Sequence, residues 1–525
     1  MRRRRWMTAK DVLRVNAFKW PDKVGIKDLN KAYTFKEWDE RASRLANALS
    51  GLGMKKGDRF AVLAYNCVEW LEIYAAAAKG GFICVPLMFR LAPPEMEYIT
   101  NHCEAKVLIV QDQWLKTVDG LKKNLPSIEK YLSFAVGNDH FEGYLTYEDA
   151  LAAASSIEPE TSVTSDDPWV IMYTGGTTGR PKGVIRSHES IAAHYFIGII
   201  DHDFEFDDCT LLVMPCCHVN SLFYSFVNTW VGATVMAYNM VSFNAEDLLK
   251  TLSEHRITFT SLVPTHYIMI LSLPQEVKEK YDVSCVKKLL CSSAPARRDT
   301  KLAILDYFKN SRLYEAYGST EAGIVTILKP HEQMEKLGSI GREVTGTNIV
   351  KLIDEEGNEI HEPGKVGELY SSSPMLFDGY WKEPERTEQA FRGDYFSAGD
   401  LGKRDEDGYY YLVDRKANMI ISGGENVFPS EVENCLGSNP KVKDVAVIGT
   451  PHDKWGEQVT AIVVLHEGQL ATEQEISGFC KGKIAGYKVP RKVHFIKEEE
   501  MPRSGAGKIL HRVLREKYGT WTDRQ

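Results

Sequence analysis

The sequence predicts an α/β protein: a large N-terminal domain with doubly wound, mostly parallel sheets and a small β subdomain, followed by a small α+β C-terminal domain. Three observations indicate this class. Short apolar runs alternate with helix-like patterns up to about residue 338, as in parallel strands joined by crossover helices. Strand-like runs separated by Asp/Gly turns follow, which favours a β subdomain. A further mixture of strand and helix patterns ends the chain.

The first long helix has recognisable start and stop signals. Thr34 and Glu37 have the spacing of a capping box, in which each side chain bonds the backbone N–H of the other residue. Apolar residues then recur at helical spacing until Gly53, which supplies a stop. An Ala-rich helix is predicted over Glu69–Lys79. Apolar runs of strand length occur at Arg59–Ala64, Ile83–Pro86, Lys106–Val110, Trp169–Tyr173, Thr210–Met214, Thr234–Tyr238, Ile257–Val263 and Lys288–Cys291.

Turn signals dominate the sequence after Gly338. They predict short strands linked by tight turns. Closer to the C-terminus, two strands are predicted at Val442–Ile448 and Val459–Leu465, and a helix is predicted over Glu473–Lys483. These elements are enough for a separate α+β domain.

Composition limits the possible classes of protein. The chain has 525 residues, of which 43% are apolar, and its formal net charge is −8. This length supports more than one domain, and the negative charge argues against nucleic-acid binding through a broad basic surface. No apolar stretch approaches the length of a membrane span. Ten cysteines without CxxC pairs indicate reduced thiols and a cytoplasmic protein.

The N-terminal segment carries an arginine run, Arg2–Arg5, and lacks the apolar core of a signal peptide. Two interpretations stay open. The arginines contact phosphate or anionic lipid, or the segment is a solvated tail or a misassigned start before Met7.

A loop rich in Gly and Thr follows the apolar run Trp169–Tyr173. It spans Thr174–Gly183 and contains the cations Arg180 and Lys182. Glycines allow successive N–H groups to face an anion, threonines add hydroxyl donors, and the cations add positive charge. The loop lacks the Gly-Lys-Ser/Thr of a P-loop, which excludes an ordinary P-loop NTPase. A polyphosphate site and a plain turn both fit this composition, so the motifs that follow decide between them.

The next motif, Tyr317–Glu321, follows the apolar run Leu313–Ala316. The ring of Tyr317 offers a face for a purine, Gly318 permits close approach of the backbone, and the carboxylate of Glu321 suits Mg²⁺.

Three further motifs occur nearer the C-terminus. Phe396–Asp400 places Asp400 after a glycine at the end of an apparent strand, where the carboxylate either binds ribose hydroxyls or forms an Asx turn. Asp414–Asn426 joins a charged cluster to a strand-like run and a glycine turn. Pro502–Lys508 is a second cationic loop. Its lysine is either solvated or delivered on a mobile loop to a developing negative charge.

With these five motifs in this order, the chain resembles the adenylate-forming superfamily of acyl- and aryl-CoA synthetases, firefly-type luciferases and peptide-synthetase adenylation domains. The resemblance covers roughly residues 10–515. It implies an AMP-forming acid–thiol ligase that uses ATP, Mg²⁺ and coenzyme A.

The resemblance assigns the ATP contacts residue by residue. Glu321 matches the Mg²⁺ partner, and the implied catalytic residues are Lys508, Glu321, Thr177 and Lys182. The residues that match the phosphate loop are Thr174, Gly175, Gly176, Thr177, Thr178, Gly179 and Lys182. Those that match the remaining nucleotide contacts are Ser293, Ala294, Pro295, Glu315, Ala316, Tyr317, Gly318, Thr320, Asp400 and Arg415. The residues that match the contacts of coenzyme A are Gly423 and Gly424 beside the pantetheine tunnel and, in some relatives, Arg90, Tyr487 and Lys488.

The implied reaction has two steps. A carboxylate attacks the α-phosphate of MgATP and gives an acyl-adenylate and pyrophosphate; the thiol of CoA then displaces AMP. Lys182, Lys508 and Mg²⁺ offset the repulsion between the two anions. Because Lys508 obstructs the second step, relatives rotate the C-terminal domain about a hinge after Arg415. The resemblance therefore predicts an adenylation domain at residues 1–416 and a mobile domain at residues 417–525.

Three positions depart from the family pattern. Gly175 replaces a typical serine, Ala398 a threonine, and Ala417 the aspartate or lysine of the hinge. None of them removes a charged group that the chemistry requires.

By the same resemblance, the acyl pocket draws on His218, Val219, Asn220, Phe223, Leu262, Gly323 and Ile324. No aspartate lies in Cys216–Ser221 to pair the ammonium of an amino acid, whose burial without a partner is costly. An aliphatic acid of modest size is the first expectation, as in fatty acid metabolism, and an aromatic acid such as a benzoate or cinnamate is the second. An enzyme that loads a carrier protein and a non-catalytic binding module are the alternatives. A homodimer is expected by analogy with relatives.

Overall fold

The computed structural model describes residues 8–134, 141–174, 181–292, 296, 298–422, 425–504 and 507–519. The chain forms two compact units. The first comprises Met1–Val350 and Ser371–Phe396, and the second comprises Lys351–Tyr370 and Ser397–Gln525.

One sheet of the first unit has the strand order β19-β9-β8-β4-β3-β5-β6-β7. The strands from β8 to β7 pair in parallel, whereas β9 is antiparallel to both β8 and β19. The strands are β3 (Arg59–Leu63), β4 (Ile83–Leu87), β5 (Val107–Gln111), β6 (Lys130–Phe134), β7 (Leu145–Thr146), β8 (Pro168–Thr174), β9 (Lys182–Ser187) and β19 (Gly379–Tyr380).

The other sheet of this unit has the order β16-β15-β14-β13-β12-β10-β11-β1-β2. The strands from β14 to β1 pair in parallel, and both ends of the sheet are antiparallel. The strands are β1 (Val24–Lys27), β2 (Ala32–Thr34), β10 (Cys209–Leu212), β11 (Thr234–Ala237), β12 (Phe259–Leu262), β13 (Lys288–Cys291), β14 (Arg312–Ser319), β15 (Gly323–Leu328) and β16 (Arg342–Glu343).

Alternate side chains of the strands enter different cores, which confirms the doubly wound class. On β3, Phe60 and Val62 join the central core, while Ala61 and Leu63 join an outer core. This is the period of two that a strand buried on both faces must show. The central core also contains residues of β11 and β12, so it lies between the two sheets. Full burial of a Phe, Val or Leu side chain in these cores contributes about 1.5–3 kcal/mol.

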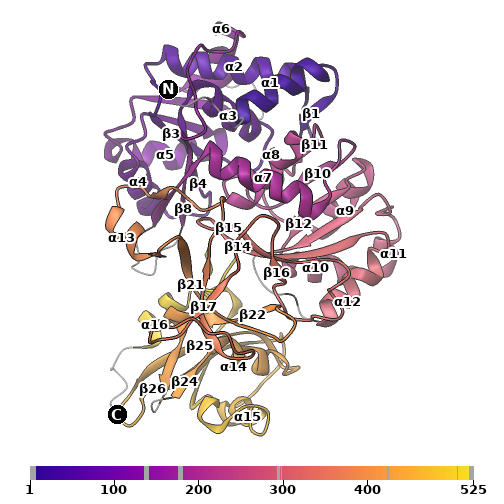
Figure 1. Ribbon diagram of the computed structural model, residues 1–525, viewed down its shortest axis with the longest axis vertical. Helices are drawn as coiled ribbons and strands as arrows, with labels where there is room; N and C mark the ends of the chain where they lie inside the picture. Colours follow the sequence, from indigo (N-terminus) through magenta and orange to yellow (C-terminus); the bar gives the residue numbers. More distant parts are fainter. Residues whose placement is uncertain are drawn as a thin grey trace. The chain divides into compact units, whose positions relative to one another are not determined.

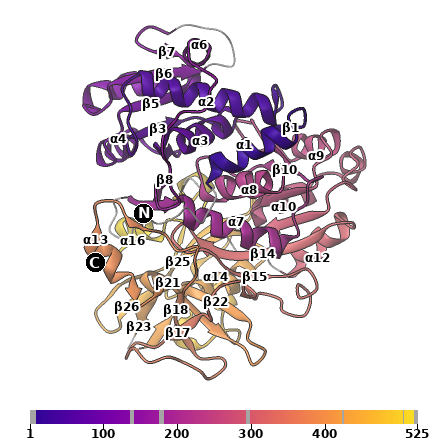
Figure 2. The ribbon, with the colours of Figure 1, turned by 45° about the horizontal axis from the view of Figure 1, so that its top comes forward.

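Helices cover both faces of each sheet in the first unit (Figure 1). The helices of the central core are α1 (Ala9–Lys19), α2 (Phe35–Gly51), α3 (Glu69–Gly80), α6 (Tyr147–Ala153), α7 (His188–His202) and α8 (Val219–Trp230). Those of the outer cores are α4 (Pro93–His102) and α5 (Leu115–Leu121) on one sheet, and α9 (Ala245–Glu254), α10 (Pro264–Leu271) and α12 (Arg298–Tyr307) on the other. In Figure 2, α4 and α12 lie on opposite sides of the first unit. The short helices are α11 (Gln275–Lys278) and α13 (Pro384–Gln389).

The predicted capping box is confirmed. Thr34 Oγ1 accepts a hydrogen bond from Glu37 N at 3.2 Å, and Glu37 Oε2 accepts one from Thr34 N at 2.8 Å. Helix α2 ends at Gly51, and Gly53 follows with a φ of +97°. The predicted strand Ile257–Val263 is shorter, because Ile257 N still bonds Leu252 O in the turn after α9.

The second unit combines an antiparallel sheet with an α+β lobe. The strands of the antiparallel sheet are β17 (Lys351–Ile353), β18 (Val366–Ser371), β21 (Tyr395–Arg404) and β22 (Tyr410–Arg415), and β20 (Phe391–Arg392) pairs with the first residues of β21. The strands of the lobe are β23 (Ile420–Ser422), β24 (Glu425–Val427), β25 (Val442–His452), β26 (Gly456–Leu465) and β27 (Lys492–Phe495). Its helices are α14 (Pro429–Gly437), α15 (Glu473–Phe479) and α16 (His511–Tyr518).

Alternation along β25 again places helices on both faces of the lobe. Val445 and Val447 pack in one core with α14 and α15. Ala446 and Ile448 pack in another core with Leu514 of α16. The helix predicted over Glu473–Lys483 stops at Phe479, because the N–H of Cys480 bonds Ser477 O in a tighter final turn.

All ten cysteines are free. Across the described ranges, none of the helices combines the length and apolar character that crossing a bilayer requires.

A buried lysine provides a test of how the first unit is held together. The side chain of Lys79 on α3 is fully buried, and its Nζ lies 2.7 Å from Asp39 Oδ1 and 2.9 Å from Glu158 Oε2. Lys79→Met leaves Asp39 without this cation, which we expect to cost about 3 kcal/mol of unfolding free energy. Chemical denaturation measures the loss.

The matched control for this prediction is Lys443→Met, which breaks an exposed ion pair with Glu498. It should cost less than about 1 kcal/mol. Equal losses for the two variants would contradict the structural role of the buried cation.

Candidate active site

The Gly/Thr-rich loop connects two antiparallel strands of the first unit. Thr174 is the last residue of β8, and it lies opposite Lys182, the first residue of β9. The predicted phosphate residues Gly175–Gly179 lie outside the described residues. Thr174 Oγ1 is buried and has no hydrogen-bond partner among the residues described. The hairpin therefore brings a hydroxyl and an ammonium to the same end of the sheet, as a phosphate ligand requires.

Lys182 and Glu321 meet at this end, together with a tyrosine that the sequence did not single out. Lys182 Nζ lies 2.7 Å from Glu321 Oε1 and donates a hydrogen bond to the Tyr380 hydroxyl at 2.6 Å. The Tyr380 hydroxyl donates to Glu321 Oε1 at 3.0 Å. Burial and the charge of Glu321 raise the pKa of Tyr380, so its phenol stays protonated. Local sequence gives no signal for Tyr380, because only the pairing of β19 with β9 brings it here.

A buried arginine, Arg186, bonds the backbone next to Glu321. Arg186 follows Lys182 by four residues on β9, so both side chains leave the same face of the strand. Arg186 Nη1 donates a hydrogen bond to Thr320 O at 2.9 Å, and Phe377 N donates one to Glu321 O at 2.8 Å. Burial lowers the pKa of Arg186 to about 10, while the nearby carboxylates of Asp378 and Glu321 oppose this shift. The segment that carries Glu321 is thus fixed by its backbone as well as by its side chain.

The first residues of the Tyr317–Glu321 motif belong to a strand. β14 continues through Ser319, because Gly318 and Ser319 pair with β15. A Cβ atom on Gly318 would lie 2.1 Å from the backbone oxygen of Gly323, so only glycine fits there. Gly323 has a φ of +73°. Both predicted glycines therefore serve the close β14–β15 hairpin, and Tyr317 is half-buried beside it.

The predicted nucleotide residue Glu315 is already engaged by protein groups. Its Oε1 accepts a hydrogen bond from Ala296 N at 3.3 Å, and the carboxylate forms an ion pair with the buried Lys301. Burial raises the pKa of Glu315, and Lys301 opposes this shift. Glu315 therefore anchors the chain next to Ser293–Pro295, which lie outside the described residues.

Predicted acyl-pocket residues gather at the carboxyl ends of β10, β12 and β13, the usual place for a ligand in such a sheet. His218 caps α8 by accepting a hydrogen bond from Asn220 N at 3.3 Å. Asn220 Nδ2 lies 3.1 Å from Ser261 Oγ and 3.4 Å from Ser292 Oγ. Leu262 is fully buried. The sequence did not single out Ser261 and Ser292, because each needs the parallel register of β12 and β13 to reach Asn220.

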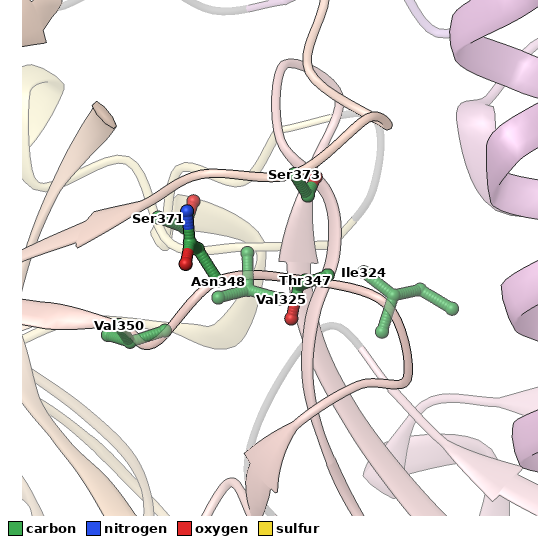
Figure 3. A pocket seen from close by; sticks show the side chains of 7 residues that line it. All are labelled: Ile324, Val325, Thr347, Asn348, Val350, Ser371 and Ser373. Carbon is green, nitrogen blue, oxygen red and sulfur yellow. The ribbon is translucent and has the colours of Figure 1, made fainter. Parts of the chain in front are cut away.

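Other predicted pocket residues face elsewhere or join neighbouring helices. Phe223 is buried on α8 and stacks on His194 of α7, with ring centroids 3.4 Å apart. Val219 is half-buried in the first turn of α8. Ile324 borders a separate small hollow, in which its side chain points away from Asn348 (Figure 3). The residues that line this hollow are Ile324, Val325, Thr347, Asn348, Val350, Ser371 and Ser373.

The second unit brings together three of the predicted residues. Asp400 lies opposite Arg415 across β21 and β22, and Arg415 Nε lies 3.0 Å from Asp400 Oδ1. The prediction that Asp400 ends a strand is wrong, since β21 continues to Arg404 by pairing with β22. Asp400 and Arg415 both act on the ammonium of Lys508: partial removal from water and the charge of Arg415 lower its pKa, and Asp400 raises it.

The loop that carries Lys508 is closed on itself. Arg503 Nη1 donates a hydrogen bond to Gly507 O at 2.7 Å, and Ser504 N donates one to Lys508 O at 2.7 Å. These bonds hold the ends of the loop together, and an ion pair between Arg503 and Asp444 on β25 ties the loop to the lobe. The sequence predicted a flexible loop here but gave no sign of this closure.

The residues assigned to CoA are divided between the two units. Gly423 and Gly424 lie outside the described residues, between β23 and β24. Arg90 is exposed beside the ring of Phe89. Lys488 forms an ion pair of 2.6 Å with Glu431.

Comparison with known proteins identifies the family. The model of the AMP-binding enzyme family matches residues 13–381, and the model of its C-terminal domain matches residues 431–508. The chain therefore belongs to the AMP-binding enzyme family. The resemblance stated from the motifs is confirmed, and the class of activity is that of an AMP-forming acyl-CoA ligase.

Individual relatives cover nearly the whole chain. Feruloyl-CoA synthase from Amycolatopsis sp is 34% identical over 502 residues, which are 95% of this chain and 96% of that protein. The long-chain-fatty-acid–CoA ligase FadD13 of Mycobacterium tuberculosis is 35% identical over 492 residues, 92% and 93% of the two chains. The crystal structure of the anthranilate CoA ligase AuaEII in complex with anthranoyl-AMP has a TM-score of 0.87 at 27% identity, covering 98% of this chain and 97% of that one.

Tyr380→Phe tests the lysine–glutamate–tyrosine cluster. The variant keeps the ring but loses the oxygen that bonds both charged groups. Because a hydrogen bond to a charged group contributes about 1.5–3 kcal/mol, we expect kcat/KM for ATP to fall at least about tenfold. ATP–pyrophosphate exchange measures this value.

Tyr144→Phe is the matched control for this variant. It removes a hydroxyl that donates a hydrogen bond of 2.9 Å to Asp119 elsewhere in the first unit. It should leave the exchange rate unchanged. If Tyr380→Phe also exchanged at the normal rate, the cluster would have no role in binding ATP.

Proposed function

We propose that this enzyme activates a small-to-medium carboxylic acid with ATP and then transfers the acyl group from the adenylate to CoA. The observation that carries this proposal is the ion pair between Lys182 and Glu321 at the end of the β8–β9 hairpin. When a nucleotide binds, such a cation can bind a phosphate, and the neighbouring carboxylate can bind the metal ion that accompanies the phosphate. The relatives named above are acid–CoA ligases, which supports the same reaction.

In the first step, the residues bind and orient two anions. Lys182 and the hydroxyl of Thr174 would hold the terminal phosphates, and Asp400 with Arg415 would hold the ribose. The ammonium of Lys508 would bridge the carboxylate and the α-phosphate. The carboxylate oxygens of Glu321 suit a hard cation, so Glu321 would hold Mg²⁺, which supplies charge neutralisation on the phosphates. The carboxylate attacks phosphorus, and pyrophosphate leaves.

In the second step, the thiol of CoA attacks the acyl carbon and AMP leaves with the bonding electron pair. We propose that residues 417–525 turn as a domain about Ala417, so that Lys508 withdraws and the Gly423–Gly424 turn approaches the pantetheine. The chain between β22 and β23 supports this boundary, since only the tight turn Lys416–Asn418 and Met419 connect them.

An aliphatic acid of modest size is the proposed substrate. Phe223 fills the space between α8 and α7, where a Cβ on Gly198 would lie 2.6 Å from Phe223 Cζ. These helices leave little room for a long chain to pass at this point. The polar groups near Asn220 are the uncharged hydroxyls of Ser261 and Ser292, which do not offset a second charge on the substrate.

An aromatic acid is the second candidate. The similarity to feruloyl-CoA synthase and to anthranilate CoA ligase favours it. A ring that carries a hydroxyl can bond an amide or serine at the polar end of a pocket.

We further propose a cytoplasmic location, which the ten free cysteines support. A homodimer is proposed only by analogy with relatives.

The function is tested by incubating the protein with MgATP, CoA and a panel of aliphatic and aromatic acids. We expect acyl-CoA and AMP in equal amounts, with the greatest yield for aliphatic acids of modest size. Greater yield with aromatic acids would select the second candidate. Release of pyrophosphate without acyl-CoA would instead indicate a carrier protein as the acceptor.

Lys508→Ala separates the two steps. Removing a cation that meets developing charge costs about 10²–10³ in rate, so adenylation should fall by about this factor. Formation of acyl-CoA from supplied acyl-adenylate should stay near the wild-type rate. Pyrophosphate exchange and thioester assays measure the two rates.

The exposed Lys454 offers a control in the same unit, and Lys454→Ala should change neither rate. Near-normal adenylation by Lys508→Ala would show that the role assigned to Lys508 is wrong.

A further inference from the structure

Two hydrogen bonds in the second unit connect the chain just before the proposed pivot to the chain after it, and a longer, exposed one joins Asn426 Nδ2 to Glu355 Oε1 at 3.4 Å. Asp414 lies near the end of β22, three residues before Ala417, and Ser430 lies in the first turn of α14. Asp414 Oδ2 accepts a hydrogen bond from Ser430 N at 2.8 Å. The Ser430 hydroxyl donates one to Val413 O. A rotation about Ala417 has to break both bonds.

Asp414 supplies the N-terminal cap that α14 lacks in its own sequence. The first N–H groups of a helix have no partners inside the helix. The residue before α14, Phe428, has no side-chain acceptor, and the helix begins with Pro429. The Asp414 carboxylate therefore accepts the N–H of Ser430 in place of a local cap, and the helix dipole favours a negative charge at this end.

Contacts on either side of Ala417 show where the chain is able to turn. Lys416 Nζ lies 2.8 Å from Glu368 on β18, so Lys416 is tied to the antiparallel sheet. Arg515 on α16 donates hydrogen bonds to Ala417 O at 2.7 Å and to Asn418 Oδ1 at 3.2 Å. Ala417 and Asn418 are therefore tied to the lobe. The backbone torsions that lie between these two attachments are those joining Lys416 to Ala417.

The same arrangement places Lys508 beside Asp400 and Arg415. Both belong to the strand pair β21–β22, which also carries Asp414. Lys508 follows the pivot in sequence and is close enough for both charges to act on it. Closure of the Asp414–Ser430 contact and presentation of Lys508 to the proposed ribose residues thus occur together.

We propose that Asp414 and Ser430 are positioning residues, which form a latch that holds the lobe in the orientation for adenylation and opens before transfer to CoA. This inference rests on the proposed function. Neither residue is proposed to touch the reacting atoms; both act through the placement of Lys508. The latch favours the first step and opposes the second.

The test compares the two half-reactions in Ser430→Ala. Loss of a hydrogen bond of about 0.5–1.5 kcal/mol corresponds to about a twofold to tenfold decrease in adenylation. Transfer from supplied acyl-adenylate to CoA should stay equal or become faster. Ser430→Thr keeps the hydroxyl and should restore adenylation. Asp414→Asn, which removes the charge and keeps the shape, should change the two rates in the same directions as Ser430→Ala.

Ser438→Ala is the matched control at the other end of α14. Its hydroxyl donates to Cys435 O within the same helix, so neither half-reaction should change. Equal decreases of both half-reactions in Ser430→Ala would indicate general damage and overturn the latch. No change in either half-reaction would overturn it as well.

Limited trypsin digestion tests the latch independently of the reaction. Lys416 is exposed, but it lies in the tight turn Lys416–Asn418. Opening of the latch should loosen this turn, so trypsin should cleave Ser430→Ala after Lys416 several times faster than the wild type and Ser438→Ala. Equal cleavage of all three proteins would refute the latch even if the ligase activity is found. Faster cleavage of Ser430→Ala without any ligase activity would support the latch and reject the proposed function.

Discussion

The ion pair between Lys182 and Glu321 joins the two sheets of the first unit at one point. Lys182 begins β9 of one sheet, and Glu321 follows β14 of the other, with 2.7 Å between the charged atoms. Each charged group also has a second partner, because the Tyr380 hydroxyl forms a hydrogen bond with both. A buried charge without such partners is strongly destabilising. The placement of the β8–β9 hairpin, the β14–β15 turn and β19 therefore depends on this contact.

Buried cations elsewhere in the first unit hold backbone segments near the site. Arg186 bonds the carbonyl of Thr320, and Lys301 pairs with Glu315, whose other oxygen accepts the N–H of Ala296. In both cases a charged side chain stabilises a residue that lies outside the helices and strands. The burial of these groups is costly by itself, and their value lies in fixing the geometry of the segments that carry the predicted ligands. In this unit the buried cations therefore act by fixing the positions of backbone segments.

The second unit meets a different requirement, because Lys508 is proposed to act in the first step only. Strong, buried ion pairs across the pivot would prevent movement, whereas single hydrogen bonds of modest strength permit it. The Asp414–Ser430 contact is of the second kind, and the pairs formed by Lys416 and Arg515 stay on their own sides of the pivot. The proposed pivot lies between two firmly attached residues and needs no special side chain, so alanine at position 417 is compatible with it.

The sequence by itself determined the order of elements, the doubly wound class and the residues that carry charge to the site. Thr34 and Glu37 predicted the start of α2 because a capping box is local, and strand periodicity is local as well. The tertiary structure alone decided that Tyr380 meets Lys182, 198 residues away in the chain. It also decided that Ser261 and Ser292 meet Asn220, and that Ser430 meets Asp414. The physical reason is that strand neighbours and register follow from the packing of whole sheets, whereas the pattern around each residue records only whether it is buried.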